Sequence, residues 1–189
     1  MRHRNSNWAY RLGMLCWILL FVPGCFKADP SPDYGPLRSE VENLYLNYHA
    51  LKAIHSDLHE AARRHIARGG DQLADIQSTA RFIAQANLIA FYQWELLSIT
   101  EYIRDSARRD FFTLRVRDVA DARRKSKDLI TAIQVYEAFI RDPEALEMIQ
   151  QAIQQIQRNM AIFDRLAEKM APLSNPPRAL EALRPETSL

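Results

Sequence analysis

The sequence predicts an all-α protein, an up-down-up-down antiparallel four-helix bundle. Apolar residues recur at alternating spacings of three and four along most of the chain, which is the pattern of helices packed along one face. No segment alternates apolar and polar residues as a strand would, and no Asn-Gly or Asp-Gly pair marks a hairpin. The expected helices are about 30 residues long and are joined by short loops, so neighbouring helices must run antiparallel.

The first two helices are expected at residues 36–68 and 71–106. Pro36 suits the first position of a helix, where its missing amide hydrogen needs no partner. Gly69-Gly70 is expected to end the first helix, and Asp71 to cap the second. Apolar residues cover most of the circumference of the second helix, which predicts that it is covered on more than one side.

The third and fourth helices are expected at residues 111–141 and 143–171. Apolar periodicity lapses over residues 106–110, and whether the second and third helices form one continuous helix is left open. Asp142-Pro143-Glu144 offers an N-cap, a proline at the first helical position and an acid in the first turn. The remaining residues, 172–189, are expected to form a mobile tail.

The N-terminus has the order of a secretory signal. Arg2, Arg4 and Arg11 precede an uninterrupted apolar run over residues 12–22. That run is too short for a membrane-spanning helix, which needs about 20 residues. We therefore expect residues 1–24 to be a signal peptide that is removed on export.

The residues that end this apolar run, Val22-Pro23-Gly24-Cys25, resemble the lipobox of bacterial lipoproteins. Val22, Gly24 and Cys25 fit that pattern, whereas Pro23 stands where the family usually has Ala or Ser. The resemblance implies cleavage between Gly24 and Cys25, a diacylglyceryl group on the Cys25 thiol, and an acyl group such as palmitate on the new amine. It also implies a protein anchored in the cell envelope, and Phe26 in place of Asp favours the outer membrane over the inner one.

The chain after Cys25 is expected to begin with a Pro-rich tether, residues 25–35. Cys16 would leave with the signal peptide, so the mature chain would have no disulfide. The whole chain has 25 basic and 23 acidic residues, and loss of the three signal arginines leaves it near neutral. We therefore expect no nucleic-acid partner.

Two histidines could bind a metal ion. His55 and His59 stand four residues apart, so both lie on one helical face. A site would have to add a carboxylate such as Glu95, Glu101 or Glu137, because the Glu-x-x-His pairs of di-iron bundles are absent from the sequence. The alternative is that both histidines are boundary residues that bond to neighbouring groups.

A basic segment runs from Arg104 to Lys127, with nine basic and four acidic residues. In an up-down bundle, the junction of the second and third helices returns to the end where the first helix begins. Side chains near that junction would then face the membrane that holds the anchor. Anionic lipid or lipopolysaccharide is accordingly a candidate partner for Arg108, Arg109, Arg115 and Arg117.

Aromatic residues gather on the second helix, where Phe91, Tyr92 and Trp94 could form a contact patch for another helix or protein. No arrangement of nucleophile, base and oxyanion site is evident, and none of the common catalytic motifs occurs. We expect a membrane-anchored lipoprotein that binds or scaffolds and is not an enzyme, with no cofactor beyond the lipid on Cys25.

Two alternatives remain open. One is a periplasmic bundle that binds a metal or cofactor through His55 and His59. The other is a small-ligand protein whose core cavity would be lined by residues such as Tyr48, Asn87 and Trp94.

Overall fold

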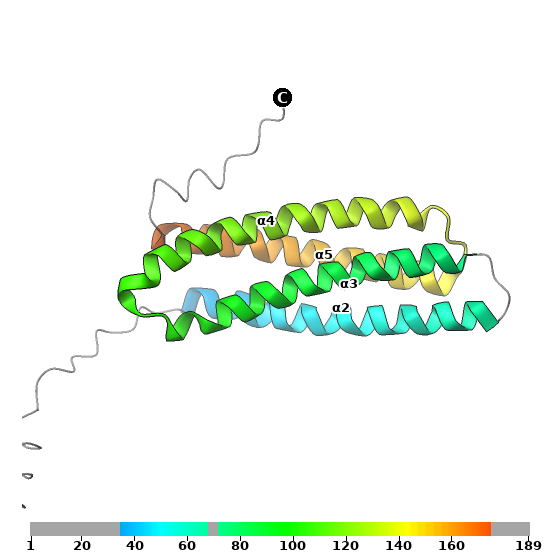
Figure 1. Ribbon diagram of the computed structural model, residues 1–189, viewed down its shortest axis with the longest axis horizontal. Coiled ribbons are helices and arrows are strands. Elements are labelled where there is room, and N and C mark those ends of the chain that lie inside the picture. The colour runs from blue at the N-terminus through cyan, green and yellow to red at the C-terminus, as the bar shows by residue number, and fades with distance from the viewer. Residues whose placement is uncertain (1–34, 68–71, 175–189) are drawn as a thin grey trace, which may run out of the picture. The chain divides into compact units, whose positions relative to one another are not determined.

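The computed structural model describes residues 35–67 and 72–174, and these form a four-helix bundle (Figure 1). The helices are α2 (Gly35–Ala67), α3 (Leu73–Ser98), α4 (Asp105–Glu137) and α5 (Pro143–Met170), with short 3-10 helices η1 (Ile99–Tyr102) and η2 (Ala171–Leu173). The predicted all-α four-helix architecture is confirmed. The expected signal peptide, most of the tether and residues 175–189 lie outside the described residues.

The four helices form a ring in which successive helices run in opposite directions (Figure 1). Each helix packs against the next one along the chain, and α5 packs back against α2, while diagonally opposite helices scarcely touch. At one end of the bundle α2 begins, α3 passes into α4, and α5 finishes; we call it the Gly35 end. The opposite end, where α5 begins, is the Asp142 end.

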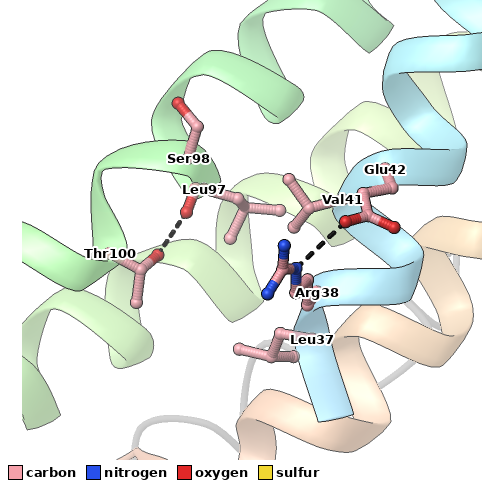
Figure 2. A pocket seen from close by; sticks show the side chains of 7 residues that line it. All are labelled: Leu37, Arg38, Val41, Glu42, Leu97, Ser98 and Thr100. Atoms are coloured by element: carbon pink, nitrogen blue, oxygen red, sulfur yellow. Dashed lines mark hydrogen bonds and ion pairs between the residues drawn. The ribbon is translucent and has the colours of Figure 1, made fainter. Parts of the chain in front are cut away.

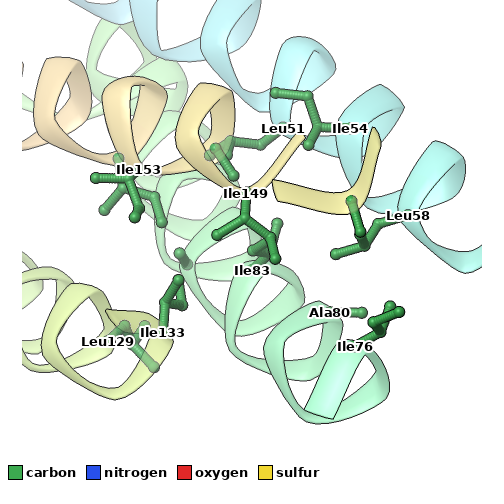
Figure 3. Close-up of a cluster of buried hydrophobic side chains, with 14 of the residues drawn as sticks. Leu51, Ile54, Leu58, Ile76, Ala80, Ile83, Leu129, Ile133, Ile149 and Ile153 are labelled. Atoms are coloured by element: carbon green, nitrogen blue, oxygen red, sulfur yellow. The ribbon is translucent and has the colours of Figure 1, made fainter. Parts of the chain in front are cut away.

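Two apolar clusters fill the bundle. The cluster toward the Asp142 end is largely aliphatic (Figure 3) and includes Leu51, Leu58, Ile76, Ile83, Ile133 and Ile149. The cluster toward the Gly35 end includes Leu37, Leu44, Leu97, Phe112, Phe163 and Met170. The half-buried Ile89 packs against both clusters. The spacings of three and four in the sequence thus correspond to the side chains that fill the core.

A polar pair lies between the two clusters. The Nδ2 of Asn47 on α2 donates to the Oδ1 of Asn159 on α5 at 2.9 Å, and Asn159 is buried. Along α2 this pair falls between Leu44 and Leu51, which belong to different clusters. Because a buried amide needs a partner, the bond favours one register of α5 against α2.

The connection between α3 and α4 differs from the predicted bounds. α3 ends at Ser98 rather than near 106, and α4 begins at Asp105 rather than near 111. The Thr100 hydroxyl, in η1, donates to the carbonyl oxygen of Leu97, near the end of α3, at 2.5 Å. Ile103 and Arg104 are then extended, with φ,ψ of −78°, 127° and −62°, 144°, so the two helices are separate.

The helix starts at the Asp142 end differ in how they are capped. The Oδ1 of Asp142 accepts from the amides of Glu144 at 2.9 Å and Ala145 at 3.3 Å, which confirms the predicted cap of α5. The N-cap of α3 is Gln72 and not the predicted Asp71. Instead of capping, the Oε1 of Gln72 accepts from the amide of Arg141 at 2.7 Å, tying the α2–α3 and α4–α5 connections together.

Candidate functional site

A row of aromatic side chains lies along the seam between α2 and α3. Ring centroids are 4.9 Å apart for Tyr45 and Trp94 and 5.1 Å apart for Tyr48 and Phe91. Each helix contributes two rings three residues apart, a spacing that places them on the same helical face. Tyr45 is 40% exposed, so the row is partly core and partly surface.

Next to this row, toward the Gly35 end, the α2–α3 surface is hollowed (Figure 2). One hollow of about 180 Å³ lies between the apolar side chains of Leu37 and Val41 on α2 and Leu97 on α3. A second hollow of about 470 Å³ shares the wall formed by Val41 and Glu42. Its other lining residues are Tyr45, Leu46 and Trp94. We call these two hollows together the α2–α3 groove.

The polar groups around the groove are mostly occupied by bonds of their own. The Nε of Arg38 donates to the Oε1 of Glu42 at 3.0 Å, along one turn of α2. On the other side, the Ser98 hydroxyl donates to the carbonyl oxygen of Glu95 at 2.7 Å. Apart from the exposed Arg38–Glu42 pair and two hydroxyl residues, Ser98 and Thr100, the lining is aliphatic and aromatic. Such a lining suits an apolar segment better than a charged small molecule.

The residues named for a core ligand cavity lie in different surroundings, and a small-ligand role stays a prediction. Trp94 lines the larger hollow of the groove, which is open at the surface. Tyr48 packs against Phe91 within the aromatic row. Asn87 is half-buried, and its Oδ1 has no hydrogen-bond partner within the described residues.

The four arginines of the predicted membrane-binding set have different surroundings. Arg108 is half-buried, and its Nη2 donates to the carbonyl oxygen of Ile103 at 3.2 Å. Arg115 is 2.5 Å from an Asp118 carboxylate oxygen and also lies over the Phe111 ring. Arg109 and Arg117 are exposed. The sequence pattern did not distinguish arginines that hold the fold from those that face solvent.

His55 and His59 lie together as their spacing predicts. Their ring centroids are 4.6 Å apart, with the rings nearly perpendicular. Burial lowers the pKa of His55 below 6.5, and the charge of His59 lowers it further. Among the side chains that the structure describes, which exclude those of Glu101 and Asp105, no three or more His, Cys, Asp or Glu residues come together as metal ligands. Neither Glu95 nor Glu137 therefore completes a site with the pair.

Among the side chains that the structure describes, the buried carboxylate is that of Glu40, which the sequence pattern did not indicate. Its side chain is 7% exposed, and its Oε1 accepts from the Nε of Arg165 and the Nζ of Lys169, both at 3.0 Å. The Arg165 hydrogen bond is the main reason that the pKa of Glu40 is lowered. Glu95 is exposed, and Glu137 is half-buried and accepts from Gln150.

Gly24 and Cys25 lie outside the described residues, so the lipobox stays a prediction. No helix among the described residues is long and apolar enough to cross a membrane. Comparison of the chain with protein-family models, with curated proteins and with solved structures gives no match.

Proposed function

We propose that this protein is a lipid-anchored component of the bacterial cell envelope whose four-helix bundle acts by binding rather than by catalysis. The observation that carries the proposal is the order of the N-terminus: arginines, an eleven-residue apolar run, and Val22-Pro23-Gly24-Cys25. An acylated Cys25 with two or more chains would hold the domain stably on a membrane, whereas a single chain would not.

The α2–α3 groove supports a binding role. It lies between two helices, and exposed Leu46 and Tyr45 stand beside Trp94 at its wall. Apolar grooves between helices commonly receive the apolar face of another helix. The partner that fits is therefore an amphipathic helix of another envelope protein.

Mass spectrometry of the protein purified from membranes tests the anchor. We expect a mature N-terminus at Cys25 that carries diacylglyceryl and acyl groups. Cys25→Ser should abolish lipidation and leave the precursor uncleaved, whereas Cys16→Ser, a change within the apolar run, should be processed normally. A cytosolic protein that retains Met1 in the wild type would contradict the proposal.

Trp94 gives a direct readout of the groove, because the other two tryptophans, Trp8 and Trp17, would leave with the signal peptide. A photoreactive amino acid in place of Leu46 should crosslink one envelope protein and form the same adduct in repeated preparations. The purified partner should then change the emission of Trp94.

A photoreactive group at Val135, which is similarly exposed on α4, is the matched control for the crosslinking experiment. Equal crosslinking from both positions, or unchanged Trp94 emission, would exclude the groove as the binding surface.

A metal-binding bundle is the second candidate, because the His55 and His59 rings lie side by side. Metal analysis of the protein as isolated tests it. Stoichiometric zinc, copper or iron that is lost in His59→Gln would favour this candidate, whereas metal that persists in that variant would exclude the histidine pair as its site.

A further inference from the structure

The Gly35 end is the end of the bundle that an anchor at Cys25 would hold near a membrane. Cys25 precedes Gly35 by ten residues, which span at most about 35 Å when fully extended. The 33 residues of α2 separate the two ends of the bundle by about 50 Å. In an upright bundle, only the Gly35 end can then touch the bilayer surface.

The turn between α3 and α4 projects at this end and carries an unusual exposed side chain. Tyr102 is 83% exposed, more than any other large apolar residue among the described ones. Ile99, in the same turn, is 42% exposed. Tyrosine is enriched where proteins meet lipid headgroups, because its ring is apolar and its hydroxyl remains hydrated.

Two exposed basic side chains follow this tyrosine within seven residues. Arg104 directly precedes α4, Arg109 lies within its first turns, and both are exposed. Arg117 is thirteen residues beyond Arg104, which places it about 20 Å further along α4. It lies on the side of the bundle and not at its end.

The turn is held in a fixed shape by the arginine that faces inward. The Arg108 guanidinium donates to the carbonyl oxygen of Ile103, and the amide of Ala107 donates to the carbonyl oxygen of Arg104 at 3.0 Å. These bonds hold the extended Ile103-Arg104 pair between η1 and α4. Arg108 thus positions the turn, and Arg104 and Arg109 are the side chains available to an anion.

We propose that the α3–α4 turn rests on anionic phospholipid, with Tyr102 at the level of the headgroups and Arg104 and Arg109 on their phosphates. The inference rests on the proposed anchor at Cys25, which raises the local concentration of the turn at the membrane. Tyrosine and arginine match the two chemistries of that surface, its apolar–polar boundary and its negative charge. The lipid-facing residues then differ from those expected from sequence: Tyr102 and Arg104 join Arg109, while Arg108 and Arg115 stabilise the fold.

The lipidated full chain allows a direct test, because lipidation occupies Cys25 and Cys16 is removed with the signal. Tyr102→Cys then provides a single thiol for a nitroxide label. In vesicles of phosphatidylglycerol and phosphatidylethanolamine, the label at position 102 should be shielded from a water-soluble nickel chelate and accessible to oxygen. Labels introduced by Leu46→Cys on the side of the bundle and Phe139→Cys at the Asp142 end should stay accessible to nickel. Both of these residues are 63% exposed.

The charge dependence identifies the lipid. Arg104→Gln with Arg109→Gln should shift the docking equilibrium of the turn about 25-fold toward the undocked state, since each basic side chain near an anionic surface contributes about fivefold. The control pair Arg117→Gln with Arg141→Gln removes the same charge from exposed positions elsewhere and should leave the label shielded. In vesicles of phosphatidylcholine alone, which carry no net charge, the docking equilibrium of the wild-type turn should shift toward the undocked state as it does in the Arg104→Gln, Arg109→Gln variant.

Each possible failure has a distinct signature. If mass spectrometry shows that the protein is lipidated and the label at position 102 is as accessible to nickel as the label at position 139, this inference is overturned. The proposed anchor is then unaffected. Stronger shielding at position 46 than at 102 means that the bundle lies on its side, which also overturns it. A protein that stays out of the vesicles because Cys25 carries no lipid overturns the proposed function and this inference together.

Discussion

Glu40 links the first and last helices of the bundle through a single carboxylate. Its partners, Arg165 and Lys169, are more than 120 positions away in the sequence and are spaced four apart on one face of α5. The two cations are partly exposed, whereas the carboxylate is buried. The acid therefore depends on its partners more than they depend on it.

Glu40→Gln should lower the free energy of unfolding at pH 7 by about 1–3 kcal/mol, because the buried charge and its ion pairs are lost. The pKa of Glu40 is lowered from 4.5 in the folded protein. Its contribution is therefore present above pH 4.5 and is lost as the pH falls further, while the carboxylate becomes protonated. Urea unfolding followed by circular dichroism should show a difference at pH 7 that shrinks toward pH 3.

Glu42→Gln is the matched control for Glu40, since Glu42 pairs with Arg38 in an exposed position on the same helix. Exposed pairs of this kind contribute between 0 and about 1 kcal/mol. Equal losses of stability in the two variants would show that the buried ion pairs of Glu40 stabilise the fold no more than the exposed pair of Glu42.

His55 should titrate below its ordinary range. Burial is the main cause of its lowered pKa, and the charge of His59 is the second. His59→Gln should therefore raise the pKa of His55 without restoring it to 6.5. NMR titration of the histidine ring protons measures this, with His49→Gln as the control that leaves His55 unchanged. A pKa of His55 at or above 6.5 in the wild type would contradict the burial argument.

The contacts of individual side chains were the feature that the sequence predicted least well. The i, i+4 spacing was enough to place His55 and His59 side by side, because helix geometry alone decides it. No local pattern indicated that Glu40 would meet α5, since its partners lie far away in the chain. Arg108 and Arg109 are adjacent and identical in type, and only the path of the backbone at Ile103 determines which one turns inward.

At the scale of helices, the clearest boundary signals were those with a local mechanism. Asp142 and Pro143 define the start of α5 because a side-chain cap and a fixed φ act within one turn. The end of α3 was harder to predict. Apolar residues continue beyond its last residue, Ser98, with Ile99 and Ile103, but the chain passes into η1 and then into the extended Ile103-Arg104 pair.

Asp142→Ala should reduce the free energy of unfolding by about 1 kcal/mol, because two amides at the start of α5 lose their acceptor. Asp128→Ala, at an exposed position inside α4, removes the same charge from a helix interior, where alanine is favourable. It should be neutral or slightly stabilising in the same thermal or urea measurement. Similar destabilisation in both variants would show that charge, and not capping, is responsible.

At the scale of the whole molecule, the four-helix architecture followed from the repeated spacing and the short connections, because long helices on short loops have few ways to bury their apolar faces. The division of the core into two apolar clusters could not be predicted from the spacing of apolar residues. Asn47 and Asn159 are ordinary amides in the sequence, and only the packing of α5 against α2 brings them together.

The number of thiols provides a test at this scale. The chain has two cysteines, Cys16 and Cys25. Removal of the signal peptide and lipidation should leave none that reacts, even after denaturation, and a reductant should not change the thermal unfolding midpoint. Titration of the denatured membrane-purified protein with a thiol reagent checks this. One reactive thiol per chain would mean that only one of the two steps, lipidation of Cys25 or removal of Cys16 with the signal peptide, had taken place, and two would mean an unprocessed precursor.

The amide pair between the two apolar clusters gives the bundle two halves that need not loosen together. We predict that each half keeps its own apolar packing when the other frays, since the polar Asn47–Asn159 pair lies between the clusters, even though the half-buried Ile89 packs against both. Native-state hydrogen exchange should then resolve two opening units rather than one. A partner bound in the groove would then require adjustment only of the helices in its own half, while the half at the Asp142 end would preserve the fold.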